Sequence, residues 1–100
     1  ETGEIVSITD DRTIQEAKTQ CLNYIRHLCS EAISSAGLDT ATQQNAALGI
    51  YSAQRCEAIK NYIAACRNEY LRCKALILAA TTNDEADSVQ FIAPPVPENL

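Results

Sequence analysis

Residues 51–80 read YSAQRCEAIKNYIAACRNEYLRCKALILAA, and this stretch decides the fold that we predict. It contains neither Pro nor Gly, the two residues that most often interrupt a helix. Apolar residues recur in it at alternating steps of three and four, as they do on the seam of packed helices. The pattern therefore predicts a long helix at about 51–80. Its apolar stripe consists of Cys56, Ile59, Ile63, Cys66, Tyr70, Cys73, Ile77 and Ala80.

The preceding sequence predicts a second long helix at about 14–36. Thr13-Ile-Gln-Glu16 is a capping box, in which the Thr13 hydroxyl accepts from a backbone amide of the first turn and Glu16 reaches back to the cap. Gly37 suits the left-handed position of a Schellman ending, and Leu38 supplies the apolar contact of that ending.

Between the two long helices we expect a short one at 41–48, which Asp39 or Thr40 begins. Gly49 is the weak point after it, because Gly in a helix interior costs about 1 kcal/mol relative to Ala. One uninterrupted helix at 41–80 is the alternative.

These helices make the chain all-α. We predict a small disulfide-stapled antiparallel bundle of two to three helices, with irregular N- and C-terminal ends. Glu1-Thr2-Gly3 is typical of the residues that a secretion vector leaves after removal of a signal peptide. The expected organisation is vector residues at 1–3, an irregular segment at 4–12, a helical disulfide-bonded domain at 13–80 and an acidic, Pro-containing tail at 81–100.

The five cysteines are typical of a small secreted domain rather than a cytosolic one. Two antiparallel helices that are stapled twice need matched spacings between their cysteines. Cys21 and Cys29 are eight residues apart, and Cys66 and Cys73 are seven apart. We therefore favour the bridges Cys21–Cys73 and Cys29–Cys66.

Cys56 is then left over, either for a chain-to-chain bridge, as an unpaired buried thiol, or as a cysteine whose partner lies outside this chain. Two other connectivities stay open. A hairpin folded at 37–39 pairs Cys21 with Cys56, and parallel helices allow that bridge together with Cys29–Cys66.

The net charge of −5 comes from the two ends of the chain. Residues 1–12 carry −3 and residues 81–100 carry −4, whereas residues 13–80 carry +2. Net negative charge disfavours nucleic acid and anionic membrane as partners. No apolar run in the sequence reaches the roughly 18 residues of a transmembrane segment.

No residue pattern indicates an enzyme. His27 is the single His, and no nucleophile motif accompanies it. One His with scattered carboxylates makes no zinc or calcium signature, and isolated glycines do not form a phosphate-binding loop. We therefore predict no catalytic residue, no metal ligand and no cofactor.

Basic residues follow one flank of the apolar stripe. Lys60, Arg67 and Lys74 recur every seven residues, and flanking charges of this kind set partner choice in helix association. We predict that this flank binds an acidic partner or a sulphated glycan; a solvated flank that covers apolar surface is the simpler alternative. The predicted binding residues are Arg55, Lys60, Arg67 and Lys74, together with the aromatic residues Tyr51 and Tyr62.

The run from Cys56 to Cys66, CEAIKNYIAAC, resembles a Cys-x-Ala-Leu/Ile-x-x-Tyr-x-x-x-Cys pattern. Such runs occur in small helical extracellular modules, including repulsive guidance molecules and the growth-arrest and glial-factor receptor families. Those modules carry more cysteines than this chain. The resemblance implies that disulfide-stapled helices of this kind serve as protein-binding modules.

Together these features predict a secreted or cell-surface interaction module, either a ligand or a receptor ectodomain fragment, which binds an extracellular protein through a helical face. A disulfide-linked homodimer follows if Cys56 bridges two copies. The alternative is an extracellular carrier of a small hydrophobic ligand, with a cavity lined by Ile25, Leu28, Ile59, Ile63 and Ile77.

Overall fold

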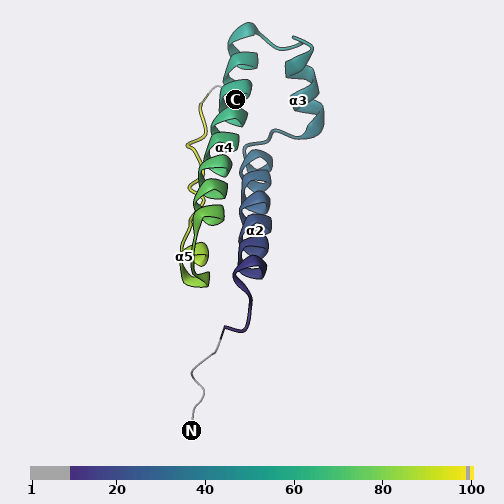
Figure 1. The fold of residues 1–100 in the computed structure, drawn as a ribbon. Helices are drawn as coiled ribbons and strands as arrows, with labels where there is room; N and C mark the ends of the chain where they lie inside the picture. The colour runs from purple at the N-terminus through teal and green to yellow at the C-terminus, as the bar shows by residue number, and fades with distance from the viewer. Residues whose placement is uncertain (1–9, 99) are drawn as a thin grey trace.

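A computed structural model describes residues 10–98 and Leu100, and these residues form four helices and no strand. This confirms the predicted all-α class. The predicted vector residues 1–3 and most of the segment at 4–12 lie outside the described residues. The helices are α2 (Ile14–Ser35), α3 (Thr40–Ala47), α4 (Ala53–Ala79) and α5 (Asn83–Asp87), arranged as in Figure 1.

Helix α2 begins and ends as its sequence predicts. The Thr13 hydroxyl accepts a hydrogen bond from the Glu16 amide at 3.1 Å, and the Glu16 carboxylate accepts one from the Thr13 amide at 2.8 Å. At the other end Gly37 has a φ of +83°, and the Leu38 amide donates to the Ile33 carbonyl at 3.2 Å. This is a Schellman ending, and its apolar contact leaves Leu38 buried.

Helix α3 is separate from α4, so the alternative of one uninterrupted helix is wrong. The Asp39 carboxylate caps α3 by accepting from an amide of its first turn at 2.7 Å. Gly49 adopts a φ of +74°, and the Ile50 amide donates to the Asn45 carbonyl at 3.0 Å, which makes a second Schellman ending. The positive φ at Gly49 turns the chain, and α4 starts four residues later.

Helices α2 and α4 pack antiparallel (Figure 1). As the residue number rises along α2, the number of the α4 residue opposite it falls by nearly the same amount. This is the register that the cysteine spacing requires. The contacts that define it join Lys18 Nζ to the Leu78 carbonyl (2.7 Å), Cys29 Sγ to the Cys66 carbonyl (3.5 Å) and the Tyr62 hydroxyl to the Ala32 carbonyl (3.4 Å).

The core consists of two small clusters. Six of the eight members of the predicted α4 stripe are buried in them, and the other two, Ile63 and Tyr70, are half-buried. The first cluster joins α3 to the helical pair, and the second joins α5 to it. Buried members of the first are Leu38, Ala46, Cys56, Ile59, Tyr62 and Cys66, and those of the second are Ile25, Cys73, Ile77, Ala80 and Ala86.

The tail at 81–100 is more ordered than the irregular end that the sequence analysis predicts. Thr82 and Glu85 form a capping box that begins α5, and Ala86 of this helix is buried against α2 and α4. Beyond α5 the chain runs back along α4 in a non-helical conformation (Figure 1). We call residues 88–98 the C-terminal strap.

Two side chains of α4 hold the strap in place. The Glu69 carboxylate accepts from the Ile92 amide at 2.8 Å, and the Arg72 guanidinium donates to the Gln90 carbonyl at 2.9 Å. The two side chains also pair with each other, with Arg72 Nη2 at 2.6 Å from Glu69 Oε2. Phe91 packs on the second core cluster below this anchor, so the strap covers one side of the helical pair.

Candidate binding surfaces

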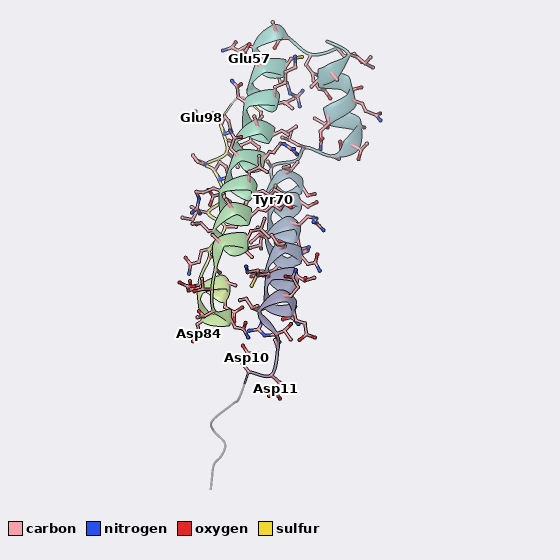
Figure 2. The ribbon with its side chains drawn as sticks, viewed as in Figure 1. Asp10, Asp11, Glu57, Tyr70, Asp84 and Glu98 are labelled. Carbon is pink, nitrogen blue, oxygen red and sulfur yellow. The ribbon has the colours of Figure 1, made fainter. Side chains whose placement is uncertain are left out.

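An open groove runs between α2 and α4, and no residue of the strap lines it. It has a volume of about 460 Å³. Cys29, Ile33 and Ile63 form an apolar floor, and all three are half-buried. Figure 2 shows Tyr70 where α4 faces α2. We call this the α2–α4 groove; its lining is Arg26, Cys29, Ser30, Ile33, Ile63, Arg67 and Tyr70.

Each helix contributes one exposed arginine to the α2–α4 groove: Arg26 from α2 and Arg67 from α4. The lining includes no carboxylate. Within the described residues, Arg26 donates only to the Asn23 amide oxygen at 3.4 Å, and Arg67 forms neither an ion pair nor a hydrogen bond through its side chain. Both guanidinium groups therefore keep their charge available to a ligand.

The predicted basic flank lies beside this groove. Lys60 and Lys74 stand one heptad before and after Arg67 on α4, so all three occupy nearly the same face of the helix. Among residues 10–98 and Leu100, neither lysine is within ion-pair distance of a carboxylate. The flank thus extends the positive charge of the groove in both directions along α4.

Arg55 and Tyr51 belong to a different contact. The Arg55 guanidinium carbon lies 4.0 Å from the centre of the Tyr51 ring, which is a cation–π distance. The Tyr51 hydroxyl accepts from the Asn45 side chain at 3.1 Å. These two predicted binding residues therefore tie the α3–α4 connection to α4 and do not reach the α2–α4 groove.

Tyr62, another predicted binding residue, lies in the core and not on the surface. Its side chain is only 3 % exposed, in the first core cluster, and its hydroxyl donates to a carbonyl of α2. Burial raises its pKa above the ordinary value. Tyr62 lies next to the apolar stripe in sequence, and the α3 side of the bundle adds enough cover to enclose it.

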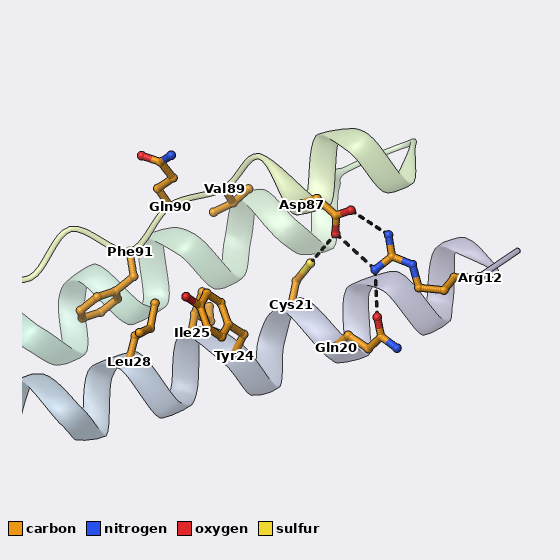
Figure 3. Close-up of a pocket in the computed structure, with 10 residues that line it drawn as sticks. All are labelled: Arg12, Gln20, Cys21, Tyr24, Ile25, Leu28, Asp87, Val89, Gln90 and Phe91. Atoms are coloured by element: carbon orange, nitrogen blue, oxygen red, sulfur yellow. Dashed lines mark hydrogen bonds and ion pairs between the residues drawn. The ribbon is translucent and has the colours of Figure 1, made fainter. Parts of the chain in front are cut away.

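A second groove, of about 580 Å³, lies where the strap and α5 meet α2 (Figure 3). Its charges are already paired. Arg12 donates to the Gln20 side chain at 2.9 Å and lies 2.7 Å from the Asp87 carboxylate, which also accepts from the Cys21 thiol at 3.2 Å. Arg12 holds the pKa of Asp87 below its ordinary value. The charged groups at this end of the groove are therefore already paired with other residues of the same chain.

All five cysteines are thiols in this structure, so the predicted bridges stay a prediction. Cys29 and Cys66 share the first core cluster, and Cys21 and Cys73 share the second. Cys56 lies in the first cluster, apart from Cys21, and this arrangement does not fit the alternative bridge between them. Burial raises the pKa of Cys29, Cys66 and Cys73 above the ordinary value, which favours the neutral thiol.

The remaining single-residue candidates form no larger site. His27 is exposed, with Nε2 at 3.6 Å from the Glu31 carboxylate. The described part of the chain holds no cluster of His, Cys, Asp or Glu that could bind a metal ion. Among the described helices, none is both long and apolar enough to cross a membrane.

The five residues predicted to line a carrier cavity do not meet in one place. Ile59 is buried in the first core cluster, whereas Ile25 and Ile77 are buried in the second. Ile63 lines the α2–α4 groove, and Leu28 lines the second groove, where the strap and α5 meet α2.

The α2 wall of the α2–α4 groove is not among the predicted binding residues. Arg26, Ser30 and Ile33 follow one another at helical steps of four and three, which was a readable signal. Their relation to Arg67 required the register between the helices. Comparison with protein-family models, with curated proteins and with solved structures finds no match to this chain.

Proposed function

We propose that the chain is a secreted or cell-surface interaction module, and that it binds an acidic region of an extracellular protein through the α2–α4 groove and the basic flank of α4. One observation carries this proposal: Arg26 and Arg67 border an apolar groove that contains no carboxylate. A protein of net charge −5 that keeps unpaired cations on one face has a charge distribution suited to steering an acidic partner there.

The other functions considered have less support. A carrier needs one cavity for its ligand, and the apolar residues proposed for it fall into separate places. A merely solvated flank would account for Lys60 and Lys74, but it leaves the half-buried apolar floor beside Arg67 without a role. We therefore propose no enzyme activity and no cofactor for the chain.

The charge variant R67Q/K74Q tests the proposal. We expect it to bind its extracellular partner about tenfold more weakly or worse, since it loses two cations of the contact surface. The measurement is binding of the fluorescent wild type and variant to an array of purified extracellular proteins, followed by titration of each hit. The loss should shrink as salt is raised, because exposed charges are screened within about 10 Å at 0.1 M salt.

The matched control is N61E/N68E, which carries the same net charge as R67Q/K74Q. Asn61 and Asn68 are exposed on a different face of α4. The control should bind like the wild type. If both double variants lose binding equally, net charge and not this face governs the interaction, and the proposed surface is wrong.

The disulfide bridges are part of this proposal, because small secreted domains with a limited hydrophobic core are commonly disulfide-bonded. We expect protein secreted into an oxidising medium to contain Cys29–Cys66 and Cys21–Cys73, and mass spectrometry of unreduced peptides would identify them. Reduction should lower the free energy of unfolding by about 2–4 kcal/mol per bridge. A bridge from Cys56 to any one of these four cysteines would contradict the predicted antiparallel pairing.

The disulfide-linked homodimer has less support than the intrachain staples. Cys56 is only 8 % exposed, and its thiol donates to the Tyr51 carbonyl at 3.6 Å. A bridge between two copies would require local opening around this side chain. We expect Cys56→Ser to leave the mobility on a non-reducing gel unchanged; loss of a dimer band on that substitution would restore the interchain bridge.

A further inference from the structure

We infer that the occupant of the α2–α4 groove is an acidic amphipathic helix of the partner protein, which completes a three-helix bundle with α2 and α4. This inference rests on the proposed function and specifies the partner's structure. On α2 the lining residues Arg26, Ser30 and Ile33 have steps of four and three, and on α4 so do Ile63, Arg67 and Tyr70.

Both walls of the groove are therefore straight ridges along helix axes, and the groove runs parallel to the helical pair. Each wall spans seven residues, which is about 10.5 Å or two turns at 1.5 Å per residue. A third helix packs into such a channel by placing its own ridge between the two. The described residues contain no strand, so the surface offers no sheet edge to an extended peptide.

The arginines specify the charge of that helix. In the register defined by Cys29 and Cys66, Arg26 lies at the level of Glu69, and Arg67 lies at the level of Leu28. The two arginines are thus on opposite walls and offset by two residues along the helix axes, or about 3 Å. A helix with an apolar stripe and carboxylates on both edges of it, at nearly the same level along its axis, would pair with both.

The basic flank extends this match beyond the groove. Lys60 and Lys74 continue the α4 wall one heptad in each direction. From Lys60 to Lys74 is fourteen residues, about 21 Å or four turns, so a helix of about 14–18 residues would meet all three cations of α4. Glu or Asp at a seven-residue spacing on the partner would complement them.

The apolar floor distinguishes a helix from a sulphated glycan. Ile33 and Ile63 are half-buried at the centre of the groove, and a glycan would gain little from covering them. A symmetric pair of chains that meet groove to groove is also disfavoured, because it would bring like charges together. An acidic amphipathic helix would cover the apolar floor with its apolar stripe and pair with the arginines on both walls.

The test uses a synthetic 18-residue amphipathic helix with Leu in its apolar stripe and Glu on both edges, and measures its binding to the full chain by fluorescence anisotropy. A Lys-edged peptide of the same stripe is the control ligand. We expect the Glu peptide to bind at least tenfold more tightly than the Lys peptide. Equal binding of the two peptides would overturn the inference.

Two protein variants locate the site. Ser30 is exposed in the groove, so Ser30→Trp fills the channel from the surface and should weaken peptide binding at least tenfold. Ser34 is exposed on α2 outside the groove lining, and Ser34→Trp should bind like the wild type. Circular dichroism of each variant establishes that it is folded. Unchanged binding by folded Ser30→Trp would place the peptide elsewhere and contradict the inference.

The same variants separate this inference from the proposed function. If a partner from the array is lost with R67Q/K74Q but still binds Ser30→Trp, the basic face binds a protein, and the helix in the groove is wrong. If R67Q/K74Q affects no partner, the proposed function itself is wrong. If both variants lose the same partner, both statements stand.

Discussion

Replacing Ile77 with alanine should lower the free energy of unfolding by about 3 kcal/mol. Ile77 is 0 % exposed and lies in the second core cluster with Ile25 and Cys73. The substitution removes three buried carbon atoms and leaves a cavity, and the measured range for such changes is about 2–5 kcal/mol. Collapse of the site is resisted because α2, α4 and α5 all contribute to this cluster.

Urea unfolding followed by circular dichroism would measure the change. Leu78→Ala is the matched control, since Leu78 is the next residue of α4 and is 50 % exposed. Its truncation removes a similar amount of hydrocarbon from a side chain that is already in water for half of its surface, so we expect a loss below about 1 kcal/mol. Equal losses for the two variants would contradict the assignment of Ile77 to the core.

The Ile77 prediction rests on features that were accessible from the sequence. A seven-residue repeat of apolar positions fixes one face of α4, and caps at Thr13 and Gly37 fix the bounds of α2, because each depends on local spacing alone. The antiparallel register was also accessible, since Cys21, Cys29, Cys66 and Cys73 have spacings that only one antiparallel pairing matches well. The apolar repeat and the helix caps are local in sequence, and the register requires only the assumption that the cysteines pair between two antiparallel helices.

The features that were not predicted depend on what covers a surface. Tyr62 lies beside the stripe, and only its position under α3 and α2 makes it core. The strap contains three prolines, which favour an extended end; its docking depends on Val89 and Phe91 meeting a cluster built from α2 and α4. The α2–α4 groove likewise needs both helices in register before Arg26 and Arg67 become neighbours of one floor.

Replacing Glu69 with glutamine should release the strap and lower the free energy of unfolding by about 2 kcal/mol at pH 7. The Glu69 carboxylate accepts from Arg72 Nε at 2.7 Å, from Arg72 Nη2 at 2.6 Å and from the Ile92 amide at 2.8 Å. Hydrogen bonds to a charged group are each worth about 1.5–3 kcal/mol, and glutamine retains the shape without the charge. Exchange of the Ile92 amide with solvent, followed by NMR, should accelerate in the variant.

The pH dependence of this effect follows from the pKa of Glu69. The hydrogen bond from Arg72 is the main cause that lowers this pKa from 4.5 to about 2. A carboxyl whose pKa falls on folding stabilises the protein above its unfolded pKa, and this stabilisation is lost as the pH falls toward its folded pKa. The stability curves of the wild type and Glu69→Gln should therefore lie apart above about pH 5 and converge between pH 4.5 and about 2.

The control for the Glu69 experiment is Glu57→Gln, which removes a carboxylate from the same helix. Glu57 is exposed near the start of α4, at the other end from the anchor of the strap. Its loss changes net charge by the same amount, so any general effect of charge would appear in both variants. We expect Glu57→Gln to leave Ile92 exchange unchanged. Two results would contradict this assignment: stability curves of the wild type and Glu69→Gln that do not converge at low pH, or equal acceleration of Ile92 amide exchange in Glu57→Gln. In either case the Glu69–Arg72 pair does not hold the strap, and Val89 and Phe91 alone would keep it on the helical pair.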